Sequence, residues 1–224
     1  MKERGMIFNG EMVRAILDGR KTQTRRIVKP QPELTKSSGF SWKGAVFGSG
    51  SDDRETNRNF AHVKCPHGKP GDRIWVRETF QGPLFDFDQM DSYCKDSTPL
   101  EKAQFCVYKA DGKSAPEFFD ADDNLHCCWR PSIHMPRWAS RILLEITDVR
   151  VERLNAISQE DAQAEGMELT GWRPTYSDPD SGGEVCTPYD NFAQLWSSIY
   201  GEESWQGNPW VWVIEFKRIE GGEA

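Results

Sequence analysis

The segment Arg141–Leu154 constrains the fold of this chain more than any other segment. Its residues Ile142, Leu144 and Ile146 share one face, and Glu145, Thr147 and Arg153 lie on the other, which is the period-two pattern of a strand with one buried face. Such a strand needs neighbouring strands and a packed layer to cover that face. The segment therefore predicts a domain built around a β-sheet.

The composition supports a core of substantial size. Only 37% of the 224 residues are hydrophobic, but the chain has twelve Phe, nine Trp and five Tyr. Aromatic side chains bury large areas each, so a core forms without many aliphatic residues. The length suits one large domain or a compact core with insertions, and wholesale disorder is not expected.

Other segments predict the elements around the long strand. Apolar residues at helical spacing indicate a helix over 10–18, followed by Gly19 where a helix-ending glycine belongs. Further strands are predicted over 73–80 and 210–219, and further helices over 158–166 and 190–199. Strands and helices do not alternate regularly, so the sequence predicts a mixed α+β domain, a small β-barrel with flanking helices.

Three stretches interrupt this pattern, at about 30–68, 81–128 and 170–187. They are rich in Gly, Pro, Asp or polar residues and show weak periodicity, which is typical of loops and insertions. We interpret the whole chain, 1–224, as a single domain that carries these three insertions. The stripe of Trp210, Trp212, Ile214 and Phe216 in the last strand is expected to face the core.

The sequence contains no sign of a membrane or secretory segment. No apolar run approaches the roughly 18–20 residues that span a bilayer, and the first ten residues lack a signal-peptide core. Six irregularly spaced cysteines indicate reduced thiols, so we expect a cytoplasmic protein without membrane contact. Residues 65–67 and 126–128 combine Cys and His but lack zinc-site spacing, so no metal and no cofactor are expected.

Positive charge is concentrated near the start of the chain. Residues 1–30 carry eight basic and three acidic side chains, whereas the whole chain has a net charge of −7. A basic segment in an acidic protein favours a small, defined anion site over a long grip on nucleic acid. The segment Gly19–Arg26 holds four cations and two threonines within eight residues.

Three interpretations of Gly19–Arg26 are open. It can be a solvated turn, as charge runs usually are. It can bind phosphate, because arginine forks match phosphate oxygens. It can also be catalytic, because neighbouring cations lower the pKa of a lysine, and Lys21 could then act as a base toward the hydroxyl of Thr24.

The segment Gly19–Arg26 resembles the G-x-K-T-x-T-x-R signature of the ASCH family, whose members have PUA-like β-barrels. Lys69–Val76 resembles the K-x-G-D turn and following strand of that family, and Trp212–Lys217 resembles its last strand. Pro131–Arg141 resembles the phage- and prophage-encoded branch of the family. The matching segments extend from about residue 10 to residue 219, interrupted by the insertions.

Some small ASCH proteins are amidohydrolases that act on N4-acetylcytidine. The resemblance implies that their Lys, Thr and Glu correspond to Lys21, Thr24 and Glu165 of this chain. Glu165 is expected at the C-terminal end of a short helix, where the helix dipole disfavours a carboxylate. In this hypothesis Lys21 takes the proton of Thr24, the threonine oxygen attacks the acetyl carbonyl, and Glu165 or Arg26 assists.

Other members of the family bind RNA, so the alternative function is a non-catalytic module for single-stranded RNA or a modified nucleotide. The loop 129–141 mixes Arg, His and Trp, which suits base stacking and phosphate contact, although the same loop could cover the barrel. We expect the site where Gly19–Arg26 meets Glu165 and the 130–141 loop. The residues expected to bind substrate or nucleic acid are Arg20, Arg25, Arg26, Arg77, Glu78, Arg130, His134, Arg137 and Trp138.

Overall fold

The structure is a computed structural model, and it describes residues 1–35, 39–48, 53–120, 124–167 and 187–219. Its helices and sheets confirm the predicted mixed α+β class. The chain divides into two compact units. The first unit comprises Met1–Asp18, Asp72–Glu145 and Lys217–Ala224, and the second comprises Gly19–Gly71 and Ile146–Phe216.

Three strands form the sheet of the first unit. β1 (Glu3–Ile7) pairs in parallel with β6 (Arg73–Arg77), and β6 pairs antiparallel with the start of β11 (Leu143–Arg153). Gly5 permits the close packing of β1 on β6, because a Cβ at this position would lie 2.5 Å from a ring carbon of Trp75. The strand predicted over 73–80 is therefore present, but it ends at Arg77.

Helix α1 (Gly10–Leu17) follows β1 and confirms the helix predicted over 10–18. Asn9 caps it, since Asn9 Oδ1 accepts a hydrogen bond from the Met12 N–H at 2.8 Å. Val13 and Ile16 are buried on its apolar face. Gly19 follows with φ of +75°, the left-handed conformation that ends many helices.

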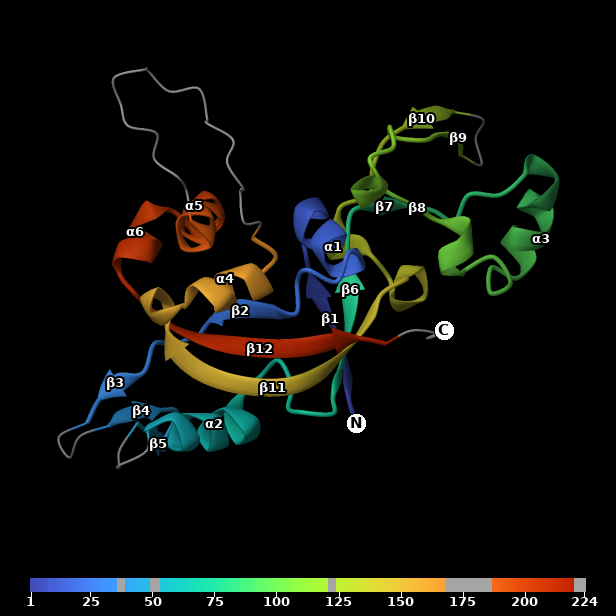
Figure 1. The fold of residues 1–224 in the computed structure, drawn as a ribbon. Helices are drawn as coiled ribbons and strands as arrows, with labels where there is room; N and C mark the ends of the chain where they lie inside the picture. Colours follow the sequence, from blue (N-terminus) through green and yellow to red (C-terminus); the bar gives the residue numbers. More distant parts are fainter. Residues whose placement is uncertain (36–38, 49–52, 121–123, 168–186, 220–224) are drawn as a thin grey trace, which may run out of the picture. The chain divides into compact units, whose positions relative to one another are not determined.

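The rest of the first unit consists of short elements (Figure 1), most of them within the predicted insertion 81–128. Phe80, Tyr108, Met135 and Ala139 form a small hydrophobic cluster that joins β7, β8 and the 130–141 loop. The pairs β7–β8 and β9–β10 are antiparallel. The elements are β7 (Phe80–Gln81), η1 (Phe87–Gln89), α3 (Met90–Lys95), η2 (Ala103–Phe105), β8 (Val107–Tyr108), η3 (Lys109–Asp111), β9 (Glu117–Phe119), β10 (Leu125–Cys127), η4 (Ser132–His134) and η5 (Arg137–Ala139).

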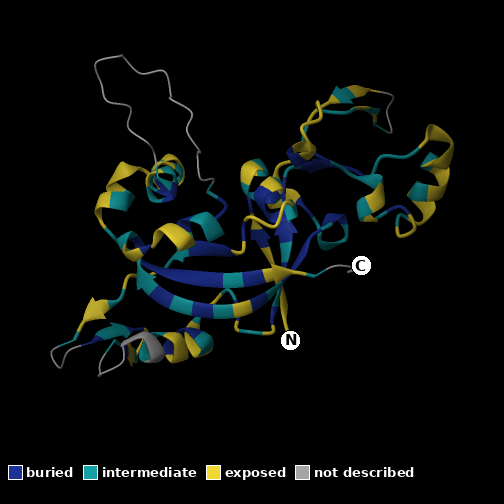
Figure 2. Cartoon of the chain, in the orientation of Figure 1, coloured by how far each residue is buried: buried dark blue, intermediate teal, exposed yellow. Residues whose placement is uncertain are grey.

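The central strand of the second unit is β12 (Trp210–Arg218), which lies between β11 and β2 (Gln23–Ile27). It pairs antiparallel with β2. Figure 2 shows β12 as buried along most of its length. Val211 and Val213 pack into a hydrophobic cluster on one face. On the opposite face Trp210 packs edge-on against Phe47, and Trp212 stacks on Phe60.

Two layers cover these two faces (Figure 1). One layer holds η6 (Leu154–Ala156), α4 (Gln159–Ala164), α5 (Pro188–Tyr200) and α6 (Glu202–Gln206). The other layer holds β3 (Glu33–Leu34), β4 (Phe40–Trp42), β5 (Ala45–Phe47) and α2 (Asp53–Lys64). The prediction that 30–68 is irregular is therefore wrong, because its strands, its helix and its aromatic residues build the layer that buries Trp210 and Trp212. That the segment is an insertion stays a prediction.

Most other predicted elements are present. β11, α4, α5 and β12 confirm the strands and helices predicted in the second half of the chain, and the aromatic stripe of β12 is buried. The described strands do not close into a barrel, since β1 and β2 each have one hydrogen-bonded neighbour in their sheet. The predicted insertion 170–187 lies outside the described residues except for Thr187, which caps α5. No helix in the described part of the chain is long and apolar enough to cross a membrane.

Candidate functional site

The segment that carries the signature lies in the second unit, against the end of α4. Lys21 and Glu165 form an isolated antiparallel bridge. The Thr22 N–H donates to the Ala164 carbonyl at 2.8 Å, and the Phe216 N–H donates to the Thr22 carbonyl at 2.8 Å. These backbone bonds hold the start of β2 between α4 and β12.

Lys21 is a lysine whose side chain has no solvent exposure. Its Nζ donates to Glu165 Oε2 at 2.6 Å and to the Glu165 carbonyl at 2.8 Å. Burial lowers the pKa of Lys21; the ion pair with Glu165 opposes this shift, and the cations of Arg26 and Arg25 add to it. The solvated turn considered from the sequence is therefore wrong for Lys21.

Glu165 is the C-terminal cap of α4, at the predicted helix end. Its side chain is only 3% exposed, and its second oxygen, Oε1, accepts from Arg25 Nη1 at 3.1 Å. One carboxylate therefore lies between two cations. Of the two residue types, lysine is the one that serves as a base in enzymes.

Arg25 connects Glu165 to a second carboxylate on α4. Its Nη2 donates to Asp161 Oδ2 at 3.0 Å, and Arg150 Nη2 donates to both Asp161 oxygens at 3.1 Å. Desolvation is the largest single contribution to the pKa of Asp161 and would raise it, but Arg150 and Arg25 together hold this pKa below its usual range. Lys21, Glu165, Arg25, Asp161 and Arg150 thus form a chain of alternating charge.

Thr24 is buried on β2, where Arg26 binds its hydroxyl. Arg26 Nη1 donates to Thr24 Oγ1 at 2.6 Å and to the Arg25 carbonyl at 2.9 Å. No hydrogen bond joins Lys21 to Thr24, both of which the structure describes. The Thr24 hydroxyl oxygen accepts a hydrogen bond from the Arg26 guanidinium, and the buried Lys21 amine lies beside the Glu165 carboxylate. A hydroxyl, a base and a carboxylate that orients the base are the components of an activated nucleophile.

The other predicted binding residues are divided between the two units. Arg20 is exposed in the second unit, where its Nη1 donates to the Gly166 carbonyl at 3.1 Å. The 130–141 loop belongs to the first unit, so Gly19–Arg26 contacts Glu165 in one unit and the loop lies in the other. The predicted residues of the first unit are Arg77, Glu78, Arg130, His134, Arg137 and Trp138.

The loop residues of the first unit are bound by their own protein. Arg77 lies 5.4 Å from the Trp75 ring centre and donates to the Ile133 carbonyl. Arg130 Nη1 donates to the Gly82 carbonyl at 3.2 Å, and Arg137 Nε donates to Glu3 at 3.1 Å. Trp138 packs against the hydrophobic cluster around Phe80, and His134 is exposed. Most of these side chains therefore stabilise the unit.

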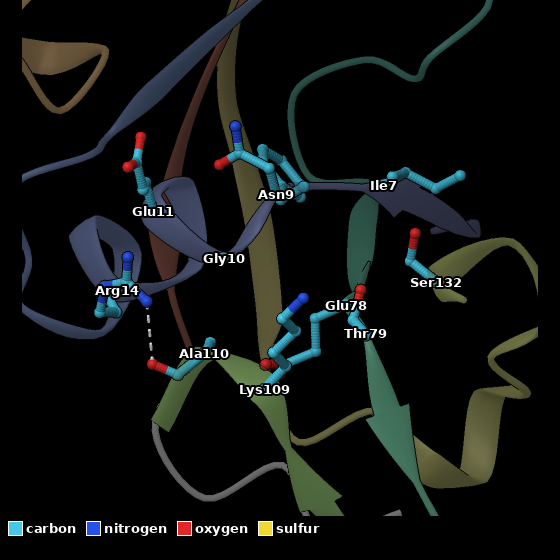
Figure 3. A pocket seen from close by; sticks show the side chains of 11 residues that line it. Ile7, Asn9, Gly10, Glu11, Arg14, Glu78, Thr79, Lys109, Ala110 and Ser132 are labelled. Carbon is cyan, nitrogen blue, oxygen red and sulfur yellow. Dashed lines mark hydrogen bonds between the residues drawn. The ribbon is translucent and has the colours of Figure 1, made fainter. Parts of the chain in front are cut away.

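Glu78 lies instead at a cavity of about 470 Å³, the first-unit pocket (Figure 3). Both oxygens of Glu78 accept from Arg141 at 3.0 Å, and Arg141 also donates to Asp111 at 2.7 Å. Desolvation raises the pKa of Glu78 despite the pair with Arg141. The pocket is lined by Ile7, Phe8, Asn9, Gly10, Glu11, Arg14, Glu78, Thr79, Lys109, Ala110 and Ser132.

Several residues of these clusters were not singled out from the sequence. The position of Asp161 could have been predicted from the sequence. It lies four residues before Glu165, and residues four apart share one face of a helix. Arg150, Asp111 and Lys109 carried no such signal, since they lie in segments without a motif. Within the described ranges, no group of three or more His, Cys, Asp or Glu residues is placed to hold a metal ion.

Comparison with protein-family models, with curated proteins and with solved structures found no match to this chain.

Proposed function

We propose that this chain is an amidohydrolase that removes an acyl group from a modified nucleoside or base through Lys21, Thr24 and Glu165. The observation that carries the proposal is the pair Lys21–Glu165, in which a fully buried amine lies 2.6 Å from a carboxylate oxygen and has a lowered pKa. A buried lysine among cations loses its proton at a lower pH than an exposed lysine does. It is then available as a base.

The first half of the reaction is acyl transfer to Thr24. Neutral Lys21 takes the hydroxyl proton, Glu165 stabilises the resulting ammonium, and Arg26 stabilises the negative charge on the threonine oxygen. This oxygen attacks the acyl carbonyl and forms a tetrahedral intermediate. The C–N bond then breaks as Lys21 returns the proton to the leaving amine, which leaves an acyl ester on Thr24.

The second half is hydrolysis of that ester. Lys21 takes a proton from a water molecule, and the hydroxide attacks the ester carbonyl. The C–O bond to Thr24 breaks, the threonine oxygen regains a proton from Lys21, and the carboxylic acid leaves. Both halves use the same amine in two protonation states, which requires a pKa lower than that of an exposed lysine.

The proposal includes kinship with the ASCH family, its phage- and prophage-encoded branch and its PUA-like barrel, and a cytoplasmic location. The signature in Gly19–Arg26 supports the kinship, together with the position of its lysine against a glutamate that ends a helix. The kinship makes N4-acetylcytidine the first substrate to test.

The test incubates purified protein with N4-acetylcytidine and follows release of cytidine by chromatography. The wild-type protein is expected to release cytidine, and Lys21→Ala is expected to lower turnover by about 10³-fold or more. Cytidine release by wild type with Lys21→Ala equally active would show that the proposed base is wrong.

A matched pair of threonine variants separates catalysis from folding. Thr24 is buried and Thr22 is exposed in the same segment. Thr24→Val removes the proposed nucleophile, and Thr22→Val makes the same replacement of a hydroxyl by a methyl group at a neighbouring position. Thr24→Val is expected to abolish turnover and Thr22→Val to retain it. Thr24→Ser, which keeps a hydroxyl, is expected to retain measurable activity.

The second candidate function is a binding module for single-stranded RNA or a modified nucleotide without chemistry. The exposed Arg20, next to the buried network, is the observation that favours it. Binding of a single-stranded RNA that weakens as salt rises, with no cytidine release, would support this function, because phosphate contacts are salt-dependent. RNA binding that ignores salt would contradict it.

A further inference from the structure

The first-unit pocket shares no residue with the network of Lys21, Glu165, Arg25, Asp161 and Arg150. All residues that line the pocket belong to the first unit, and the network belongs to the second. The pocket volume of about 470 Å³ lies within the range of small-molecule sites. In Figure 3 the first turn of α1 borders it on one side, and Glu78, Thr79, Lys109 and Ser132 contribute side chains from other elements. The pocket is thus built by four separate segments, and its lining combines polar and apolar residues.

Glu78 is a rigid acceptor at this pocket. Its carboxylate is 2% exposed and is fixed by the fork of Arg141, which is itself fixed by Asp111 and by the Tyr108 ring, 3.9 Å from the guanidinium carbon. An ionised carboxylate offers about four lone-pair positions, and the fork uses one on each oxygen. Each Glu78 oxygen can therefore accept one more hydrogen bond.

The charges around Glu78 leave a negative excess. Glu78 and Asp111 carry two negative charges, and Arg141 between them carries one positive charge. Burial raises the pKa of Glu78, which indicates that its ionised form is short of solvation. A ligand group with N–H donors and positive charge would supply what the cluster lacks.

Lys109 supplies the opposite charge at the same pocket. Its side chain is exposed, and the structure describes no ion pair for it among the described residues. The first turn of α1 adds backbone N–H groups without intrahelical acceptors, and Ser132 and Thr79 add hydroxyls. Glu11 and Arg14, both exposed on α1, add one charge of each sign. Apart from these two residues, the charges at the pocket are the net negative charge of the cluster of Glu78, Arg141 and Asp111 and the positive charge of Lys109.

We propose that the first-unit pocket binds a free amino acid as its zwitterion, with the ammonium on Glu78 and the carboxylate on Lys109. A ligand with one charge of each sign matches the lining, whereas a nucleotide phosphate would bring two negative charges next to Glu78, Glu11 and Asp111. The apolar wall of Ile7, Phe8 and Ala110 leaves room for the amino-acid side chain. The proposal does not rest on the Lys21 chemistry.

The test measures binding to the full chain by thermal shift and then by calorimetry. The probes are the common L-amino acids, each added singly, and for every binder its N-acetyl form and its carboxamide form. One or more amino acids are expected to bind saturably, and both blocked forms are expected to bind at least about tenfold more weakly, because each loses one charge-assisted contact. Cytidine monophosphate is the competing probe.

Two lysine variants localise the binding. Lys109→Ala is expected to weaken it about fivefold, as for an exposed ion pair, and Lys113→Ala, an exposed lysine in the same region that does not line the pocket, is expected to leave it unchanged. Glu78→Gln is expected to weaken it about tenfold. Because Glu78→Gln can also disturb folding, the surface variant Lys109→Ala decides the result.

Four outcomes would overturn the proposal. They are saturable binding of no amino acid, equal binding of the blocked forms, unchanged binding in Lys109→Ala, and binding of cytidine monophosphate in place of amino acids. These binding results are independent of cytidine release. The proposal of an amino-acid site and the proposal of amidohydrolase activity can therefore be rejected separately.

Discussion

Each unit of this protein holds a buried glutamate paired with an arginine, and the two glutamates differ in what else surrounds them. Glu165 is bound on one oxygen by Lys21 and on the other by Arg25. Glu78 has both oxygens on one arginine and lies at a cavity. Glu165 is shared by two cations and therefore affects the pKa of its neighbour Lys21. Glu78 has spare acceptor capacity beside a cavity and is therefore suited to bind a ligand.

The largest expected effect concerns the stability of these two pairs. Glu165→Gln is expected to lower the free energy of unfolding by about 3–5 kcal/mol, because it leaves Lys21 and Arg25 buried without their carboxylate. Glu78→Gln is expected to cost about 1–3 kcal/mol, since Arg141 is partly exposed and keeps Asp111. Urea unfolding of both variants measures the difference. Equal losses would show that the two glutamates are equivalent.

The next effect is the dependence of turnover on pH. Since the base must be neutral Lys21 and its pKa is lowered from 10.5, kcat/KM is expected to rise with pH and level off below pH 10.5. Below that pKa the rate is expected to fall about tenfold per pH unit. A profile of cytidine release against pH measures this. An inflection at or above 10.5 would contradict a desolvated Lys21.

Stability should depend on pH in opposite directions in the two units. The raised pKa of Glu78 contributes stability that is full below the unfolded value near 4.5 and is lost as pH rises through the folded value. The lowered pKa of Asp161 contributes stability that is full above the unfolded value near 3.8 and is lost as pH falls.

Over a pH range that starts at 4.5, the advantage of wild type over Glu78→Gln is therefore expected to shrink as pH rises through the raised pKa of Glu78. The advantage over Asp161→Asn is expected to grow as pH rises from acid. Chemical unfolding of the three proteins from acid pH through this range measures both trends. Trends of the same sign would contradict the assignment.

The smallest expected effect is that of Lys109→Ala on stability. Lys109 is exposed and makes no ion pair among the described residues, so its removal is expected to change the free energy of unfolding by less than about 0.5 kcal/mol. Urea unfolding beside Lys113→Ala measures this. A larger loss would mean that Lys109 stabilises the fold, and its weakened ligand binding would then have a structural cause.

The sequence predicted the elements whose signals are local. The alternation in Arg141–Leu154 predicted β11, Ser158 and Gly166 bounded α4, and the stripe from Trp210 predicted β12. It did not predict that both faces of β12 are buried. The face of Trp210 and Trp212, predicted to be core, is covered by residues from 30–68, where the pattern is weak. The opposite face, with Val211 and Val213, carried no such prediction and is buried against the helical layer. The predicted barrel is also not seen in the described strands. Closure of a barrel depends on pairing between strands that are distant in the sequence, and local patterns do not determine that pairing.

The candidate site divides in the same way. The sequence by itself determined the cations and threonines of Gly19–Arg26, and through a family resemblance it grouped Lys21 and Thr24 with Glu165. Only the tertiary structure decided that the Lys21 side chain is excluded from solvent and that Arg25 binds the same carboxylate, Glu165. It also decided that Arg141 joins Glu78 to Asp111 beside a cavity. Local patterns fix helices and strands because their forces act within a few residues, whereas burial and ion pairing join residues as far apart as 21 and 165.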